Sequence, residues 1–147
     1  MKNILMKILA AALPVMAGAL ATTSDSVKLI DKTTGELTTA SYFTLLPEGT
    51  LQMGPHLAGI CAIVAVVLAI AFLALHKAGL VKVIKWVSFG GACLAVLPMF
   101  IHEGNQLMLP HWGVPAFLMA EFFLCAVAEK KNLFAPKEAE APRLQRR

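Results

Sequence analysis

The sequence predicts an all-α integral membrane protein, in which a bundle of three transmembrane helices follows an N-terminal signal peptide and a small extracytoplasmic β-hairpin. The first observation is Leu57 to Leu75, nineteen residues without a charge, because a helix needs roughly 20 apolar residues to cross a bilayer. The second is composition, with 58% hydrophobic and only 15% charged residues, whereas soluble domains average about 25% charged. The third is that two more apolar runs follow.

Residues 1–21 have the pattern of a secretory signal peptide. Lys2 and Lys7 supply the positive start, a short apolar stretch follows, and small residues at Ala19 and Ala21 mark a cleavage site. We expect cleavage after Ala21, because the apolar stretch is shorter than a span of roughly 20 residues. The alternative is an uncleaved first transmembrane helix.

Residues 22–54 are predicted to form an extracytoplasmic β-hairpin segment. Val27–Ile30 and Leu37–Phe43 are rich in strand-forming residues, and Gly35 between them suits a turn with positive φ. An isolated hairpin is only marginally stable in water. We therefore expect this hairpin to pack on the membrane surface or on a partner.

Residues 55–128 are predicted to hold the three transmembrane helices, at about 57–75, 86–101 and 112–128. The remaining residues, 129–147, contain many charges, two prolines and no apolar periodicity. This segment is predicted to be a basic cytoplasmic tail.

The distribution of Lys and Arg predicts the orientation. Segment 76–85 and the C-terminal tail together hold nine of the thirteen Lys and Arg residues, whereas 22–54 and 102–111 hold only Lys28 and Lys32. Positive residues favour the cytoplasmic side. We expect a multi-pass protein of the bacterial cytoplasmic (plasma) membrane, with the hairpin outside and the tail inside.

The chain carries no recognisable catalytic motif, so it is predicted not to be an enzyme. There is no G-x-S-x-G, H-E-x-x-H, P-loop or G-x-G-x-x-G sequence. The net charge of +4 does not indicate nucleic-acid binding, because the basic residues lie at the ends of apolar runs. The expected partners are the lipid bilayer and either further copies of the chain or a larger membrane complex.

Glu121 interrupts the third apolar run, and a carboxylate near the bilayer centre costs a few kcal/mol. Depth matching places it level with Ala92 and Cys93, where no basic residue lies. It is expected to be protonated, or hydrogen-bonded to Ser88, a backbone carbonyl or another subunit. We favour a helix-association contact over a proton or cation relay, because a relay needs further polar groups.

Gly90 and Gly91 lie inside the second run and permit close approach of another helix. With Glu121 they form the predicted helix-association site. The leading functional hypothesis is therefore a small non-enzymatic membrane protein, an assembling or accessory subunit of a membrane complex. A pore-forming protein is a weaker alternative, because the apolar runs show no polar stripe to line water.

A second alternative is a copper or haem binder on the extracytoplasmic face, acting in metal handling or electron transfer. Three histidines each follow a methionine by three residues: Met53 and His56, Met99 and His102, Met108 and His111. Thioether and imidazole groups together suit Cu(I), and either can be an axial ligand of haem iron. The competing interpretation is that these histidines are ordinary amphipathic side chains at a membrane interface.

Overall fold

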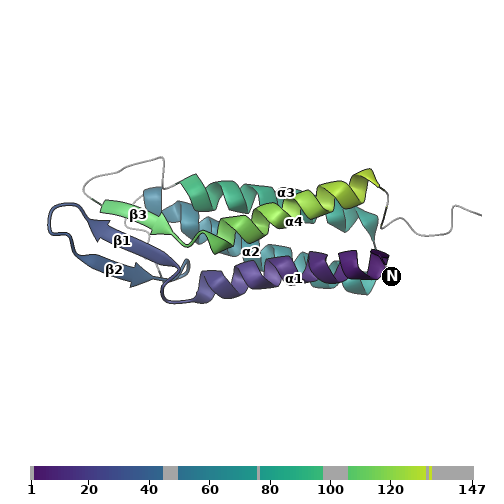
Figure 1. Ribbon diagram of the computed structural model, residues 1–147, viewed down its shortest axis with the longest axis horizontal. Helices are drawn as coiled ribbons and strands as arrows, with labels where there is room; N and C mark the ends of the chain where they lie inside the picture. The colour runs from purple at the N-terminus through teal and green to yellow at the C-terminus, as the bar shows by residue number, and fades with distance from the viewer. Residues whose placement is uncertain (1, 45–49, 76, 98–105, 132, 134–147) are drawn as a thin grey trace, which may run out of the picture.

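Four antiparallel helices form a bundle, and a small antiparallel sheet covers one end of it (Figure 1). The computed structural model describes residues 2–44, 50–75, 77–97, 106–131 and 133. The helices are α1 (Lys2–Thr22), α2 (Thr50–Leu75), α3 (Ala78–Val96) and α4 (Gly113–Lys130). The strands are β1 (Val27–Asp31), β2 (Leu37–Ala40) and β3 (Gln106–Pro110).

The helices pack in a closed ring, in which α1 contacts α2 and α4, and α3 contacts the same two helices. The bundle thus has four helices rather than the predicted three, because the N-terminal apolar segment packs as a full member. Three helical segments are long and apolar enough to cross a membrane: Ile4–Thr22, Met53–Leu75 and Ala78–Val96. Helix α4, one of the three predicted spans, carries Glu121, Glu129 and Lys130 and is not among them.

Two helices begin earlier than the sequence pattern predicts. Helix α3 starts at Ala78 rather than near Trp86, so the basic segment predicted as a loop, with Lys82 and Lys85, is helical. Helix α2 starts at Thr50 and therefore contains Pro55. Pro55 is the sixth residue of α2, beyond the first four positions whose N–H groups have no partner within the helix, so it removes one backbone hydrogen bond of the helix.

The predicted hairpin is present. Strands β1 and β2 pair antiparallel, and Gly35 in the connection has a φ of 73°. Strand β3, in a segment predicted as a loop, pairs with the other edge of β1, with Val27 opposite Pro110. The sheet order is β2-β1-β3. The hairpin thus gains a third strand from the same chain. Pairing with β3 satisfies the backbone N–H and C=O groups along the edge of β1 that would otherwise be open.

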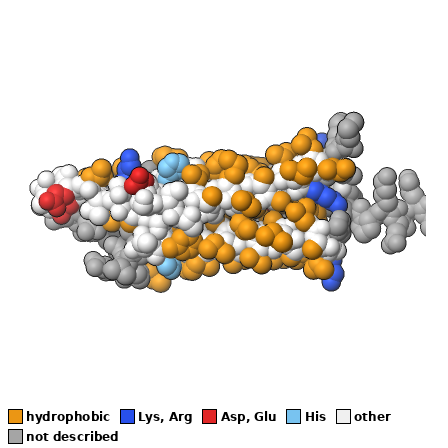
Figure 2. Space-filling model, turned by 90° about the horizontal axis from the view of Figure 1, so that it is seen from below, with side chains coloured by type: hydrophobic (Ala, Val, Ile, Leu, Met, Phe, Trp, Pro, Cys, Tyr) orange, Lys and Arg blue, Asp and Glu red, His pale blue; other side chains and the backbone are white. Residues whose placement is uncertain are grey.

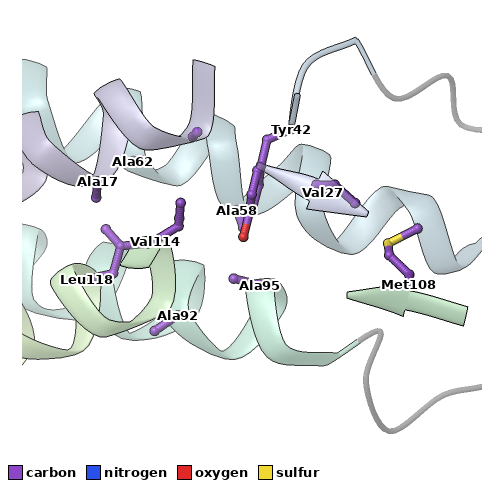
Figure 3. Close-up of a cluster of buried hydrophobic side chains, with 11 residues drawn as sticks. Ala17, Val27, Tyr42, Ala58, Ala62, Ala92, Ala95, Met108, Val114 and Leu118 are labelled. Atoms are coloured by element: carbon purple, nitrogen blue, oxygen red, sulfur yellow. The ribbon is translucent and has the colours of Figure 1, made fainter. Parts of the chain in front are cut away.

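Alanine dominates the core between the helices. Figure 3 shows the cluster near the sheet, where the side chain of Tyr42 reaches across toward Ala95. The buried members of this cluster are Ala17, Ala21, Val27, Tyr42, Ala58, Ala62, Ala92, Ala95, Met108, Val114 and Leu118. A second cluster lies toward the other end: Ala69, Phe72, Val81, Ile84, Cys125 and Ala128. Small side chains let helix backbones approach closely.

Large apolar side chains point outward instead. Hydrophobic side chains cover the length of the bundle in Figure 2, whereas charged side chains gather at its two ends. Examples of exposed apolar residues are Val67, Ile70, Trp86 and Phe123. A soluble bundle shows the opposite pattern, with a polar outer face on each helix.

The packing of α1 predicts that the chain keeps residues 1–21. Ala21, the expected cleavage site, is fully buried, and its carbonyl oxygen accepts a hydrogen bond from the backbone N–H of Tyr42 at 3.1 Å. The Ser26 hydroxyl donates to the same oxygen at 3.3 Å. We expect the intact mass of the protein purified from membranes to include this segment. A mass corresponding to a chain that starts at Thr22 would instead identify it as a cleaved signal peptide.

Candidate functional site

The predicted methionine and histidine layer is only partly within the described residues, because Met99 and His102 lie outside them. Met53 and His56 are on α2, where Met53 is exposed and the His56 ring packs edge-on to Phe43, with ring centroids 6.2 Å apart. The Nδ1 atom of His56 is buried and has no hydrogen-bond partner among the described residues.

The two residues of the third pair, Met108 and His111, lie in different surroundings. Met108, on β3, is buried in the core cluster. The exposed His111 accepts a hydrogen bond at Nδ1 from the backbone N–H of Gly113, 3.0 Å away. Figure 2 shows histidine side chains at opposite edges of the bundle. No group of three or more His, Cys, Asp or Glu within the described ranges is arranged to hold a metal. A copper or haem site at these residues stays a prediction.

The two predicted association glycines face different surroundings. A Cβ atom added at Gly91 would lie 2.8 Å from Cys61 Cβ and 3.1 Å from Leu118 Cδ1, so this position holds α2, α3 and α4 close together. A Cβ atom added at Gly90 would meet no atom within 4 Å. Gly91 therefore serves packing within the chain, whereas Gly90 is open to the surroundings.

Gly90 lies on an apolar groove between α2 and α3. The groove has a volume of about 500 Å³ and is lined by Cys61, Lys82, Val83, Trp86, Val87 and Gly90. Trp86, 61% exposed, forms one wall, and its ring contacts Phe89 and Phe122 at centroid distances of 6.1 Å and 6.4 Å. These ring contacts hold the indole in place.

Glu121 is fully buried inside the bundle. Its Oε1 atom accepts a hydrogen bond from the Cys125 thiol at 3.3 Å, and its Oε2 atom has no partner among the described residues. The Ser88 hydroxyl, also fully buried, is likewise without a partner there. With His56 Nδ1 and the Tyr42 hydroxyl, they are the four buried side-chain groups without a partner among the described residues, and each such group calls for an explanation.

Helix register puts Glu121 and Ser88 at the same level. Leu118 contacts the position of Gly91, and α3 and α4 run antiparallel (Figure 1). Glu121 lies three residues after Leu118 on α4, and Ser88 lies three residues before Gly91 on α3. Because the two helices are antiparallel, both steps lead in the same direction along the bundle. Glu121 therefore lies about one helical turn farther from the sheet than Ala92, the level that the sequence predicted. We call the end of the bundle away from the sheet, where Lys82, Lys85 and Lys130 lie, the lysine-bearing end.

An ion-pair cluster lies at that end. Lys85 Nζ is 2.5 Å from Glu129 Oε2, and Lys82 Nζ is 3.7 Å from Glu129 Oε1. Lys85 is 15% exposed and Glu129 is 35% exposed. The hydrogen bond from Lys85, with the positive charges of both lysines, lowers the pKa of Glu129 below its ordinary value.

Sequence reasoning missed three of these features. The Lys85–Glu129 pair joins residues 44 apart, although opposite charges at the same end of adjacent helices gave a signal for it. The bond from Cys125 to Glu121 follows from i,i+4 spacing, which the sequence displays. The Tyr42 hydroxyl, buried and without a partner among the described residues, had no local signal.

The chain matches no protein-family model, no curated protein and no solved structure. The geometry of the described residues is therefore the basis for a functional proposal.

The ion-pair cluster predicts an acid-sensitive stability contribution. Because the folded-state pKa of Glu129 is lowered, its stabilisation is fully present above the ordinary glutamate pKa of 4.5 and is lost as pH falls through the folded-state value. The thermal midpoint in detergent should be higher for the wild type than for Glu129→Gln at pH 7, and this difference should shrink as pH falls below 4.5. A difference that is independent of pH would contradict this assignment. Glu36→Gln, at the opposite end of the bundle, is the control.

Proposed function

We propose that this chain is a small non-enzymatic, multi-pass protein of the bacterial cytoplasmic membrane that assembles with a second copy of itself through the groove between α2 and α3. The observation that carries the proposal is the open glycine at Gly90 beside the exposed Trp86. An apolar groove with a small residue at its floor is the surface on which transmembrane helices pack.

Membrane insertion is supported by the exterior of the bundle. Exposed apolar side chains on all four helices, such as Leu5, Ile70, Trp86 and Phe123, would meet water in a soluble protein. In lipid these same side chains have an apolar surrounding. Helix α4 completes the ring despite Glu121, because that side chain points into the bundle.

The orientation proposed has the sheet outside and the opposite end inside. Figure 2 shows the charges at the two ends: acidic and basic side chains at the sheet end, and lysines at the other. Lys82 and Lys85 on α3 and Lys130 on α4 belong to the lysine-bearing end. The excess of positive charge at this end favours the cytoplasmic side.

Self-association is favoured over an unrelated partner by symmetry. Two copies inserted in the same orientation are related by a two-fold axis along the membrane normal, so identical residues meet at equal depth. At that axis each groove would present Gly90, the smallest residue, to the corresponding residue of the other copy. The assembly proposed is therefore a dimer with α3 at its centre.

Labelling predicts the topology. In a chain whose three native cysteines are replaced by alanine, a membrane-impermeant thiol reagent added to intact cells should modify Lys32→Cys and spare Lys131→Cys. Both positions are exposed, at opposite ends of the bundle. Permeabilised cells should show both labelled, which controls for reactivity. Labelling of Lys131→Cys in intact cells would overturn the orientation.

Substitution in the groove tests the assembly. Gly90→Leu should fill the groove and lower dimer affinity in lipid by at least about tenfold, or about 1.4 kcal/mol, measured by fluorescence energy transfer between labelled copies. The matched control is Gly79→Leu, a second glycine of α3 with open space around it. In the cysteine-free chain, Val87→Cys should form an intermolecular disulfide and Phe123→Cys should not. Equal affinity for the Gly90→Leu variant and the wild type would contradict the proposed interface.

A further inference from the structure

Polar side chains recur along the seam between α3 and α4, from the bundle interior to the lysine-bearing end, with Cys125 among them in the apolar cluster of Ile84 and Ala128. On α4 the side chains of Glu121, Cys125 and Glu129 follow at four-residue intervals and so share one face. The Cys125 thiol donates to Glu121 Oε1 at 3.3 Å. From Glu121 to Glu129 the helix rises about 12 Å, at about 1.5 Å per residue.

The opposite wall of the seam is on α3. Ser88 lies level with Glu121, and Lys85, three residues earlier on the same helix, pairs with Glu129 at 2.5 Å. Each polar residue of α4 in the seam, apart from Cys125 in the middle, thus has a polar counterpart on α3. The outer end of the seam is the 35% exposed carboxylate of Glu129.

The surroundings of Glu121 suit two protonation states. Glu121 Oε2 and the Ser88 hydroxyl are not hydrogen-bonded to each other or to any other described residue. Because a hydroxyl acts as donor or acceptor, a rotation of either side chain would let Ser88 accept a hydrogen bond from the neutral acid or donate one to the ionised carboxylate. The Cys125 thiol donates to Oε1 in either state. No Lys, Arg or His among the described residues forms an ion pair with Glu121, so desolvation favours the neutral acid.

The route toward the sheet is apolar. Leu118, one turn closer to the sheet on α4, is fully buried and contacts the position of Gly91. Beyond it are buried Val114, Ala92 and Ala95, in the cluster of Figure 3. These side chains supply no hydrogen-bonding group that could carry a proton, so the route is apolar as far as Ala95, about 10 Å along α3 from the level of Ser88. The hydroxyl of Tyr42, in the same cluster, lies beyond that gap.

From this arrangement we propose that Glu121 is a proton-binding site that exchanges its proton only with the lysine-bearing side, through Cys125 and Glu129. Release breaks the O–H bond of the Glu121 acid, and the Cys125 sulfur accepts this proton as the thiol's own proton is passed on, so the thiol is restored. The Glu129 carboxylate gains the passed proton as a new O–H bond and releases it to water. No electron is transferred and no bond to carbon changes. This inference does not depend on dimer formation, so loss of assembly in Gly90→Leu leaves it intact.

Each of the four helices packed around Glu121 carries charged or titratable side chains. They are Lys7 on α1, Cys61 on α2, Lys82 and Lys85 on α3, and Cys125, Glu129 and Lys130 on α4. The lysines lie toward one end of the bundle, where their charge favours release of a proton to the adjacent aqueous phase. The lysines thus favour proton exchange between Glu121 and the aqueous phase at their own end of the bundle. This exchange does not require a net flow of protons across the membrane.

Infrared difference spectroscopy of the full-length protein in liposomes tests the site. A pH jump should change the carbonyl stretch of a protonated carboxylic acid, and this band should be absent from Glu121→Gln. The control Glu36→Gln, which removes a carboxylate on the exposed hairpin, should retain it. A band that persists unchanged in Glu121→Gln would overturn the proposal.

Proteoliposomes sorted by orientation test the direction of exchange. With the lysine-bearing end exposed to the pH jump, the band should respond at least tenfold faster than with the sheet end exposed. Glu129→Gln should slow this fast response about tenfold. Equal rates in the two orientations, or an unchanged rate in Glu129→Gln, would overturn access through the seam.

A second variant keeps the test valid if Glu121→Gln does not fold. Ser88→Ala preserves the acid and removes its proposed hydrogen-bond partner, so the carboxylic acid band should remain and move to higher frequency. Ser24→Ala, the same change at an exposed serine in the turn before β1, should leave the band in place. A band at the same frequency in Ser88→Ala and the wild type would overturn the Ser88–Glu121 pairing.

Discussion

Close approach of the helix backbones is the constraint on which the rest of this structure depends. In lipid, apolar side chains gain little by leaving the bilayer, so van der Waals contact between helices must hold them together. The alanine-rich interfaces and Gly91 provide this contact, since even a Cβ atom at Gly91 would lie 2.8 Å from Cys61 Cβ. The same tight packing excludes water from the surroundings of Glu121 and brings Ser88 to its level. The buried polar pair is thus a result of how closely α3 approaches α4.

Two adjacent glycines divide the contacts of α3 between the interior and the exterior. Gly91 lies against α2 and α4, whereas Gly90, turned by about 100° around the helix, has open space. A helix can therefore pack within its own chain and present a groove to another copy without any change in conformation. The proposed proton-binding site at Glu121 faces α3 at the level of Ser88, and the proposed association site at Gly90 is on another face of the same helix. Helix α3 therefore takes part in both proposed sites.

Local signals in the sequence predicted much of the fold, and non-local contacts explain what they missed. The uncharged runs and the hairpin around Gly35 were visible because each depends on neighbouring residues. Strand β3 was missed because its partner β1 lies far away in the chain. Glu121 stood out as one charge in an apolar run, but its level relative to Ser88 required the helix register. The Met–His spacing does not indicate in which direction each side chain points or how deeply it is buried. Met108 lies in the core, whereas His111 is exposed.

The position of β1 at the centre of the sheet ties the two halves of the chain together at one end of the bundle. Its neighbours β2 and β3 come from the connections after α1 and after α3. A copy in which α3 and α4 inserted upside down would carry β3 to the opposite surface and leave one edge of β1 with unpaired N–H and C=O groups. Open strand edges promote aggregation and recruit other chains. The three-stranded sheet can therefore close only in a chain whose connections after α1 and after α3 lie at the same end of the bundle.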